Sequence, residues 1–119
     1  MTVNIPFSEA ALQIAQYFKN PRFKFTVAYE LHGTPLQIKI WQALTKIPVG
    51  KTVTYNDLAK QLGTSPRVIG NACRNNPLPI IIPCHRAVAT NGNGGFCGTT
   101  SGKMLELKQW LLAHEQQAN

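Results

Sequence analysis

The 119 residues suffice for one compact domain, and a composition that is 44% hydrophobic with no apolar run of about 18 residues excludes a transmembrane span. Three cysteines without a Cys-x-x-Cys pair argue against a disulfide framework, and a start without the regions of a signal peptide leads us to expect a cytoplasmic protein, or a nuclear one in a eukaryote. The net charge is +7, with Asp57 the only acidic residue between Leu31 and Leu105, which is typical of a protein with a polyanionic partner or of a basic surface without one.

A first helix is predicted from Ser8 to Phe18. Ser8 can cap this helix, and Leu12, Ala15 and Phe18 recur at a spacing that places them on one face. The helix is predicted to end before Asn20-Pro21, and the stretch 23–29, rich in aromatic and β-branched residues, follows as an extended connector.

Two further helices are predicted from their start and stop signals. Thr34 as cap and Pro35 at the first helical position begin one of them. Its apolar face predicts a place in the core and consists of Leu36, Ile40, Trp41, Leu44 and Ile47. Thr54 caps the other, which is short and is predicted to end at Gly63.

Ser65-Pro66 begins another short helix, 67–74, and together with the preceding one it suggests a helix-turn-helix in a basic region. Many pairs of helices bind nothing, so this pattern alone leaves nucleic-acid binding open. Gly70 and Ala72 are small enough for a close approach either to a neighbouring element or to a nucleic-acid backbone. Arg67 and Arg74 add positive charge to the same helix.

The segment from Pro79 to Arg86 presents a thiol. Three isoleucines between two prolines form a short, stiff, apolar stretch that leads directly into Cys84, His85 and Arg86. The thiolate is the reactive form of cysteine, and cationic or hydrogen-bonding neighbours lower the pKa of a thiol from its usual value of about 8.5. From residue types alone, Cys84 is either a nucleophile or a core residue.

The rest of the chain contains a loop and a helix. Residues 91–98 are predicted to be a flexible glycine-rich loop that contains Phe96 and Cys97. A last amphipathic helix is predicted over residues 103–116, with Leu107 and Leu111 on its apolar face. The three histidines of the chain lack the spacing of metal ligands, so no metal site is predicted.

The string Asn76-Pro-Leu-Pro-Ile-Ile-Ile-Pro-Cys-His-Arg-Ala-Val88 closely resembles the active-site segment of the O6-alkylguanine-DNA alkyltransferases, also called methylated-DNA-protein-cysteine methyltransferases. The resemblance extends from about Phe7 to Glu115 and implies a mainly α, winged-helix-like domain with a helix-turn-helix and a short extended active-site segment. Residues 33–119 would form the catalytic and DNA-binding domain. Residues 1–32 would be an N-terminal helix and connector that remain from the inter-domain region, without the family's N-terminal sheet domain.

This resemblance also implies a reaction. Cys84 would take the alkyl group from O6-alkylguanine in double-stranded DNA, once per molecule and without a cofactor, and we expect the protein to act as a monomer. His85 would act as the base, and Glu115 would orient the histidine. Related alkyltransferase-like proteins bind such lesions without reacting, but they typically carry tryptophan in place of the reactive cysteine, so Cys84 argues against this alternative.

The resemblance extends to contacts with the base and with DNA. Arg67 falls where the family has an arginine that occupies the space of an extruded nucleotide, on a recognition helix that enters the minor groove. The implied DNA-binding residues are Arg67, Gly70, Ala72 and Arg74. The implied substrate-binding residues are Tyr55, Asn76, Val88, Phe96, Cys97 and Lys108. Phe96 departs from the family, since it stands where tyrosine is usual and lacks the hydroxyl.

Overall fold

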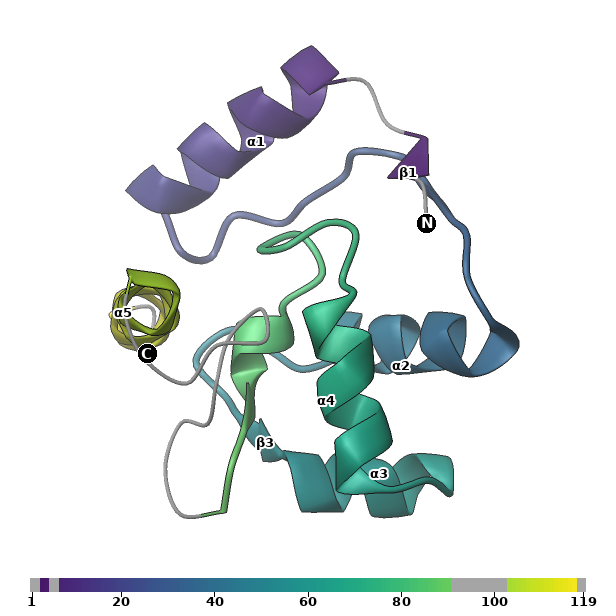
Figure 1. Ribbon diagram of the computed structural model, residues 1–119. Coiled ribbons are helices and arrows are strands. Elements are labelled where there is room, and N and C mark those ends of the chain that lie inside the picture. The colour runs from purple at the N-terminus through teal and green to yellow at the C-terminus, as the bar shows by residue number, and fades with distance from the viewer. Residues whose placement is uncertain (1–2, 5–6, 91–102, 118–119) are drawn as a thin grey trace.

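A computed structural model describes residues 3–4, 7–90 and 103–117 and shows a mainly helical chain (Figure 1), which confirms the predicted fold class. The helices are α1 (Phe7–Lys19), α2 (Pro35–Thr45), α3 (Tyr55–Leu62), α4 (Pro66–Arg74), the 3-10 helix Cys84–Arg86 and α5 (Lys103–Gln116). The strands, each of two residues, are β1 (Val3–Asn4), β2 (Glu30–Leu31), β3 (Val53–Thr54) and β4 (Ala87–Val88). In this part of the chain, no helix is long and apolar enough to cross a membrane.

The two strand pairs connect distant parts of the sequence. β1 pairs with β2 in antiparallel register, and β3 pairs with β4 in parallel register, with Val53 opposite Ala87. The second pair joins the residues before α3 to the residues that follow the 3-10 helix. It therefore places the beginning of α3 beside the predicted active-site segment.

Side-chain caps define where the central helices begin, as the sequence predicts. Thr34 and Gln37 form a capping box, in which the Thr34 hydroxyl accepts the N–H of Gln37 at 3.1 Å and the Gln37 side chain accepts the N–H of Thr34 at 2.9 Å. Thr54 accepts the N–H of Asp57 at 3.0 Å at the start of α3. At the start of α4, Ser65 accepts a backbone N–H in the same way. The predicted helix pair, α3 and α4, is therefore confirmed, and the two helices pack against each other.

Replacing Gly63 by alanine is expected to destabilise the fold by about 1 kcal/mol. Gly63 ends α3 with a φ of 70°, in the left-handed region, while an added Cβ would meet nothing within 4 Å, so the cost arises from the backbone alone. Urea denaturation measures the effect. Gly70→Ala is the matched control, because Gly70 lies inside α4 with equally open surroundings and alanine is the better helix former, so it should stabilise. Equal effects of both substitutions would contradict this account.

Helix α2 crosses the centre of the core, as its apolar face predicts. Ile40, Trp41 and Leu44 are fully buried, whereas Leu36 at the start of the face is 37% exposed. The indole Nε1 of Trp41 donates a hydrogen bond of 2.9 Å to the backbone oxygen of Ala72, so α2 is joined to α4 by a polar contact inside the apolar core.

The face of α1 that carries Leu12 and Phe18 turns outward. Leu12 and Phe18 are 62% and 42% exposed, whereas Gln13 and Tyr17 are buried. The amide oxygen of Gln13 accepts the N–H groups of residues 26 and 27 at 3.0 and 3.2 Å, which fixes the connector against the helix. The face of α1 that turns inward therefore combines the apolar side chains of Ala10 and Ile14 with these polar contacts.

The apolar segment before Cys84 is turned rather than continuously extended. The N–H of Ile82 donates to the oxygen of Leu78 at 2.9 Å, and Ile80 adopts a φ of 77°, which is rare for a β-branched residue. The extended part of the predicted active-site segment is β4, directly after the 3-10 helix.

Candidate active site

The candidate nucleophile, Cys84, begins the 3-10 helix that lies between the turn 78–82 and β4. Its side chain is 2% exposed and forms no disulfide. Helices α2 and α5 both contact this 3-10 helix. The thiol therefore lies inside the domain, where a reacting group can reach it only by entering the protein.

His85 and Glu115 form a fully buried pair that joins the 3-10 helix to α5. The imidazole Nε2 lies 2.7 Å from Oε2 of the carboxylate, and both side chains are 0% exposed. Burial favours a raised pKa for Glu115, but hydrogen bonds from His85 and Arg86 outweigh it and hold the pKa well below its usual range. Glu115 is therefore ionised, and the Nε2 proton of His85 faces it.

The other nitrogen of His85 is available as a base. Burial lowers the pKa of His85, although the contact with Glu115 opposes this shift, so the ring is neutral near pH 7. With the proton on Nε2, Nδ1 carries the lone pair. Among the buried side-chain nitrogen and oxygen atoms of the described residues, Nδ1 of His85 is the one without a hydrogen-bond partner.

Arg86 binds the same carboxylate through two parallel hydrogen bonds. Its Nε lies 2.9 Å from Oε1 of Glu115, and its Nη2 lies 2.8 Å from Oε2. Its third nitrogen, Nη1, donates to the backbone oxygen of Ile47 at 2.6 Å. The sequence identifies Arg86 only as a cationic neighbour of Cys84. In the structure, its guanidinium instead fixes the position of Glu115.

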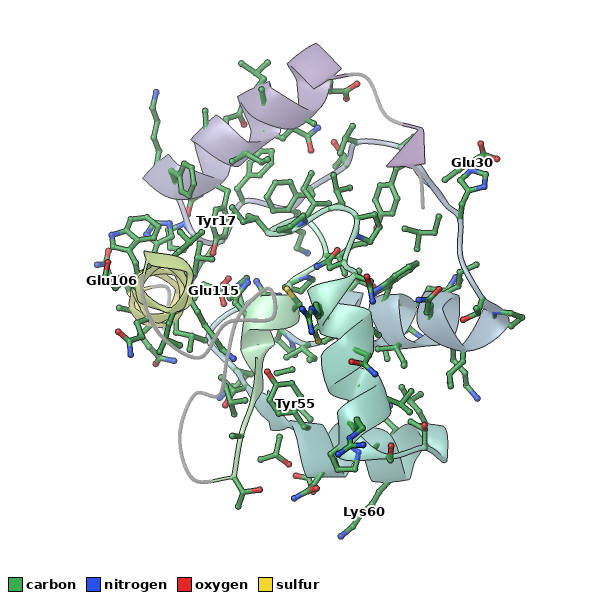
Figure 2. All side chains as sticks on the ribbon, viewed as in Figure 1. Tyr17, Glu30, Tyr55, Lys60, Glu106 and Glu115 are labelled. Atoms are coloured by element: carbon green, nitrogen blue, oxygen red, sulfur yellow. The ribbon has the colours of Figure 1, made fainter. Side chains whose placement is uncertain are left out.

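Tyr17 is a member of this site that the sequence analysis missed. Its hydroxyl donates a hydrogen bond of 2.6 Å to Oε2 of Glu115, and the side chain is 1% exposed. Figure 2 shows Tyr17 at the end of α1 near Glu115 of α5. The two residues are 98 positions apart in the sequence, so no local pattern indicates the contact.

Tyr55 and Lys108 meet on the side of the site formed by α3, α5 and β4, the strand that contains Val88. Nζ of Lys108, which is fully buried, donates to the oxygen of Ala87 at 2.8 Å and to the Tyr55 hydroxyl at 3.4 Å. Burial, with smaller contributions from the charges of Cys73 and Cys84, raises the pKa of Tyr55 to about 12. The Tyr55 hydroxyl therefore stays protonated at neutral pH.

Asn76 joins the end of α4 to the turn that precedes Cys84. Its side-chain Nδ2 donates to the oxygen of Ile82 at 2.8 Å, and its Oδ1 accepts the N–H of Leu78 at 2.9 Å. One side chain thus holds both ends of the turn 78–82. These contacts of Asn76 are with the backbone of the segment that leads to Cys84.

The outer face of α4 carries Arg67 and Arg74, which are both exposed and two helical turns apart. Gly70 lies between them, with open space where a Cβ would be. The prediction that Ala72 contacts DNA is corrected, because Ala72 is 2% exposed and belongs to the core. Its small side chain allows a close approach to a neighbouring element, not to a nucleic-acid backbone. The predicted contacts of Phe96 and Cys97 lie outside the described residues.

Comparisons with known proteins all point to one family. The family model for the 6-O-methylguanine DNA methyltransferase DNA-binding domain matches residues 35–117. The chain is 40% identical over 114 residues to a probable methylated-DNA–protein-cysteine methyltransferase of Acanthamoeba polyphaga mimivirus, a match that covers 93% of this chain and 73% of the relative.

Solved structures match the chain at similar identity. The O6-methylguanine methyltransferase of Mycobacterium tuberculosis superposes with a TM-score of 0.81 at 36% identity, and the match covers 95% of this chain and 67% of the other. The OGT protein of the same organism, solved in complex with DNA, superposes with a TM-score of 0.78 at 34% identity, covering 94% and 67% of the two chains.

Proposed function

Because this chain belongs to the 6-O-methylguanine DNA methyltransferase family, we propose that it repairs DNA by transferring the alkyl group of O6-alkylguanine irreversibly to Cys84. One observation carries the proposal. Cys84 is directly followed by His85, whose Nε2 contacts Glu115, so that the buried Nδ1 remains available as a base. The protein would act where DNA is held, in the cytoplasm or, in a eukaryote, in the nucleus.

In this mechanism the thiol is activated through His85. Neighbouring side chains in a tight turn seldom face each other, so one water carries the proton from Sγ of Cys84 to Nδ1 of His85. Glu115 holds the ring by Nε2 and stabilises the imidazolium that forms. The resulting thiolate is the nucleophile.

The transfer is a single displacement at the alkyl carbon. The S–C bond forms as the C–O6 bond breaks, and the electron pair of that bond stays with the guanine oxygen. The guanine takes up one proton, which balances the proton that the thiol lost. The repaired guanine, still part of the DNA, then leaves the pocket. The product is a thioether, which thiol exchange does not reverse, so each molecule acts once and no cofactor takes part in the reaction.

We assign the guanine pocket to the side of Cys84 where Tyr55 and Lys108 meet. The protonated hydroxyl of Tyr55 can donate a hydrogen bond to the guanine ring, and the backbone of Val88 lies alongside in β4. Asn76 fixes the turn that places the thiol at this pocket. Phe96 and Cys97 complete our proposed set of base contacts.

The burial of Cys84 requires the base to leave the duplex. A thiol that is 2% exposed cannot reach a base edge inside a stacked helix, so the nucleotide must be extruded into the protein. The exposed face of α4 is our proposed surface for the minor groove, with Arg67 occupying the space of the extruded nucleotide. Arg74 and the open side of Gly70 lie on the same face.

An Arg67→Ala variant is expected to lose much of its rate on duplex DNA while keeping its rate on free O6-methylguanine, because only the duplex requires extrusion. Unstacking costs a few kcal/mol, so the loss on duplex should be on the order of tenfold or more. Lys19→Ala, at the end of α1, removes the same charge away from α4 and serves as the control. Equal losses on duplex and free base would rule out this role for Arg67.

The proposed function is tested by counting repaired lesions with the duplex in excess over protein. We expect O6-methylguanine to disappear from the DNA until one lesion has been lost per protein molecule, and then to remain constant. Continued repair would contradict transfer to the protein itself. Retention of the modified duplex without any loss of the methyl group would instead identify a lesion-binding protein of the non-enzymatic kind.

A further inference from the structure

We propose that Tyr17 of α1 is a positioning residue for alkyl transfer, whose hydroxyl holds the Glu115 carboxylate in the orientation that binds His85. The inference rests on the proposed function and adds to it a residue outside the family-model match, which begins at residue 35. It implies that helix α1 is part of the catalytic machinery.

The packing of Tyr17 directs its hydroxyl toward the carboxylate. The ring lies 5.7 Å from that of Phe25 and meets the imidazole of His114 edge-on at 5.2 Å. Nε2 of His114 also lies 2.8 Å from the backbone oxygen of Tyr17, so α5 holds this residue by backbone as well as by side chain. With 1% of its surface exposed, the side chain has no room to turn away from Glu115.

The hydroxyl shares one oxygen with the catalytic histidine. Oε2 of Glu115 accepts hydrogen bonds from Tyr17, His85 and Arg86, at 2.6, 2.7 and 2.8 Å. Burial and the bond to Glu115 both raise the pKa of Tyr17, so the hydroxyl remains a donor at every pH at which the protein works. The hydroxyl therefore restrains the carboxylate, and its hydrogen bond also offsets part of the negative charge that faces His85.

This sharing predicts the sign of a pH effect. Without the Tyr17 hydroxyl, more of the negative charge on Glu115 faces His85 and stabilises its protonated form, so the pKa of His85 rises. The other charged groups that act on His85 are Arg86 of the same turn and Lys108 of α5, and both lower its pKa. Neither is altered by removal of the hydroxyl, so the base form of His85 should be lost at a higher pH than in the unmodified protein.

The test is a Tyr17→Phe variant, which keeps the ring packing and removes only the hydroxyl. At saturating O6-methylguanine duplex, we expect the rate of methyl transfer to fall by roughly tenfold with unchanged affinity for the duplex, since the lost bond acts on the reacting groups. The acidic limb of the pH–rate profile should move to higher pH. In a protein that already carries Glu115→Gln, Tyr17→Phe should change neither the rate nor the pH profile further, because the hydroxyl acts through the carboxylate.

Tyr29→Phe is the matched control, because Tyr29 lies half-buried in the same aromatic region and its hydroxyl is not a donor to Glu115. If Tyr17→Phe and Tyr29→Phe give the same rate and pH profile, the positioning role is wrong, whatever their melting temperatures. If the unmodified protein itself transfers no methyl group, the proposed function fails and this inference falls with it. The two failures are thus distinguished within one experiment.

Discussion

A Cys84→Ala variant is expected to accept no methyl group from O6-methylguanine while still binding the modified duplex. The substitution removes the nucleophile but leaves the exposed face of α4 and the His85–Glu115 pair in place. Labelled duplex measures both properties, since transfer moves the label to the protein and a gel shift reports binding. The substitution removes only one sulfur atom from the core, so we expect little loss of stability, whereas methyl transfer should be lost completely.

The control for this variant is Cys73→Ala. Cys73 is the second buried cysteine of the described residues, 7% exposed, and its charge acts on Tyr55 and Lys108 as that of Cys84 does. We expect Cys73→Ala to transfer the methyl group at close to the unmodified rate, because Cys73 has no adjacent histidine base. Methyl transfer that survives in Cys84→Ala but disappears in Cys73→Ala would contradict our assignment of the nucleophile.

An Arg86→Met variant is expected to lose about 3–5 kcal/mol of unfolding free energy, because it leaves Glu115 ionised and buried without its cation. The long apolar side chain keeps much of the packing, so the loss reflects the charge and the two hydrogen bonds. Arg74→Met is the matched control, since Arg74 is exposed on α4 and should contribute close to nothing. Urea denaturation of both variants measures the difference.

The same variant has a predicted pH dependence. In the unmodified protein the pKa of Glu115 is depressed, so its contribution to stability is present above the ordinary carboxyl pKa of 4.5 and is lost only as the pH falls well below it. Arg86→Met removes part of that depression, so Glu115 takes up its proton at a higher pH. We therefore expect acid unfolding to begin at a higher pH than in the unmodified protein. An unchanged acid midpoint would show that Arg86 does not hold the charge on Glu115.

The helix boundaries near the site could be predicted because each has a local signal. Thr34, Thr54 and Ser65 cap the helices that follow them, and Gly63 provides the left-handed residue that ends α3. A cap acts within three residues of the chain, so its geometry is already present in the sequence. The short strands β3 and β4 were not predicted, since a pair of two residues leaves no pattern of alternation.

The network around Glu115 could be predicted only in part. The family resemblance places Cys84, His85 and Glu115 in one site, and the structure brings His85 and Glu115 into contact. Tyr17 was missed because α1 has two apolar faces in its sequence, and the one that turns inward carries Ala10, Ile14 and Tyr17 rather than Leu12 and Phe18. The partner of the Tyr17 hydroxyl is a carboxylate on α5, 98 positions away. Periodicity indicates which residues share a face, but it does not indicate a hydrogen-bond partner that is distant in the sequence.

Helix α5 also buries polar side chains that apolar periodicity does not predict. Its predicted apolar face includes Leu111, which is fully buried, but Lys108, His114 and Glu115 are buried with it. Each of these polar side chains is matched to a partner elsewhere in the chain, such as the oxygen of Ala87 for Lys108. A helix that turns polar groups inward in this way supplies chemistry to the site as well as packing.

The most direct test of the central claim is mass spectrometry of the protein after it is mixed with a slight excess of duplex that carries one O6-methylguanine. We predict the gain of a single methyl group, confined to the peptide that contains Cys84, in essentially every molecule. Methylation at another residue would contradict the assignment of Cys84, and an unchanged mass for a protein that holds the modified duplex would contradict alkyl transfer altogether.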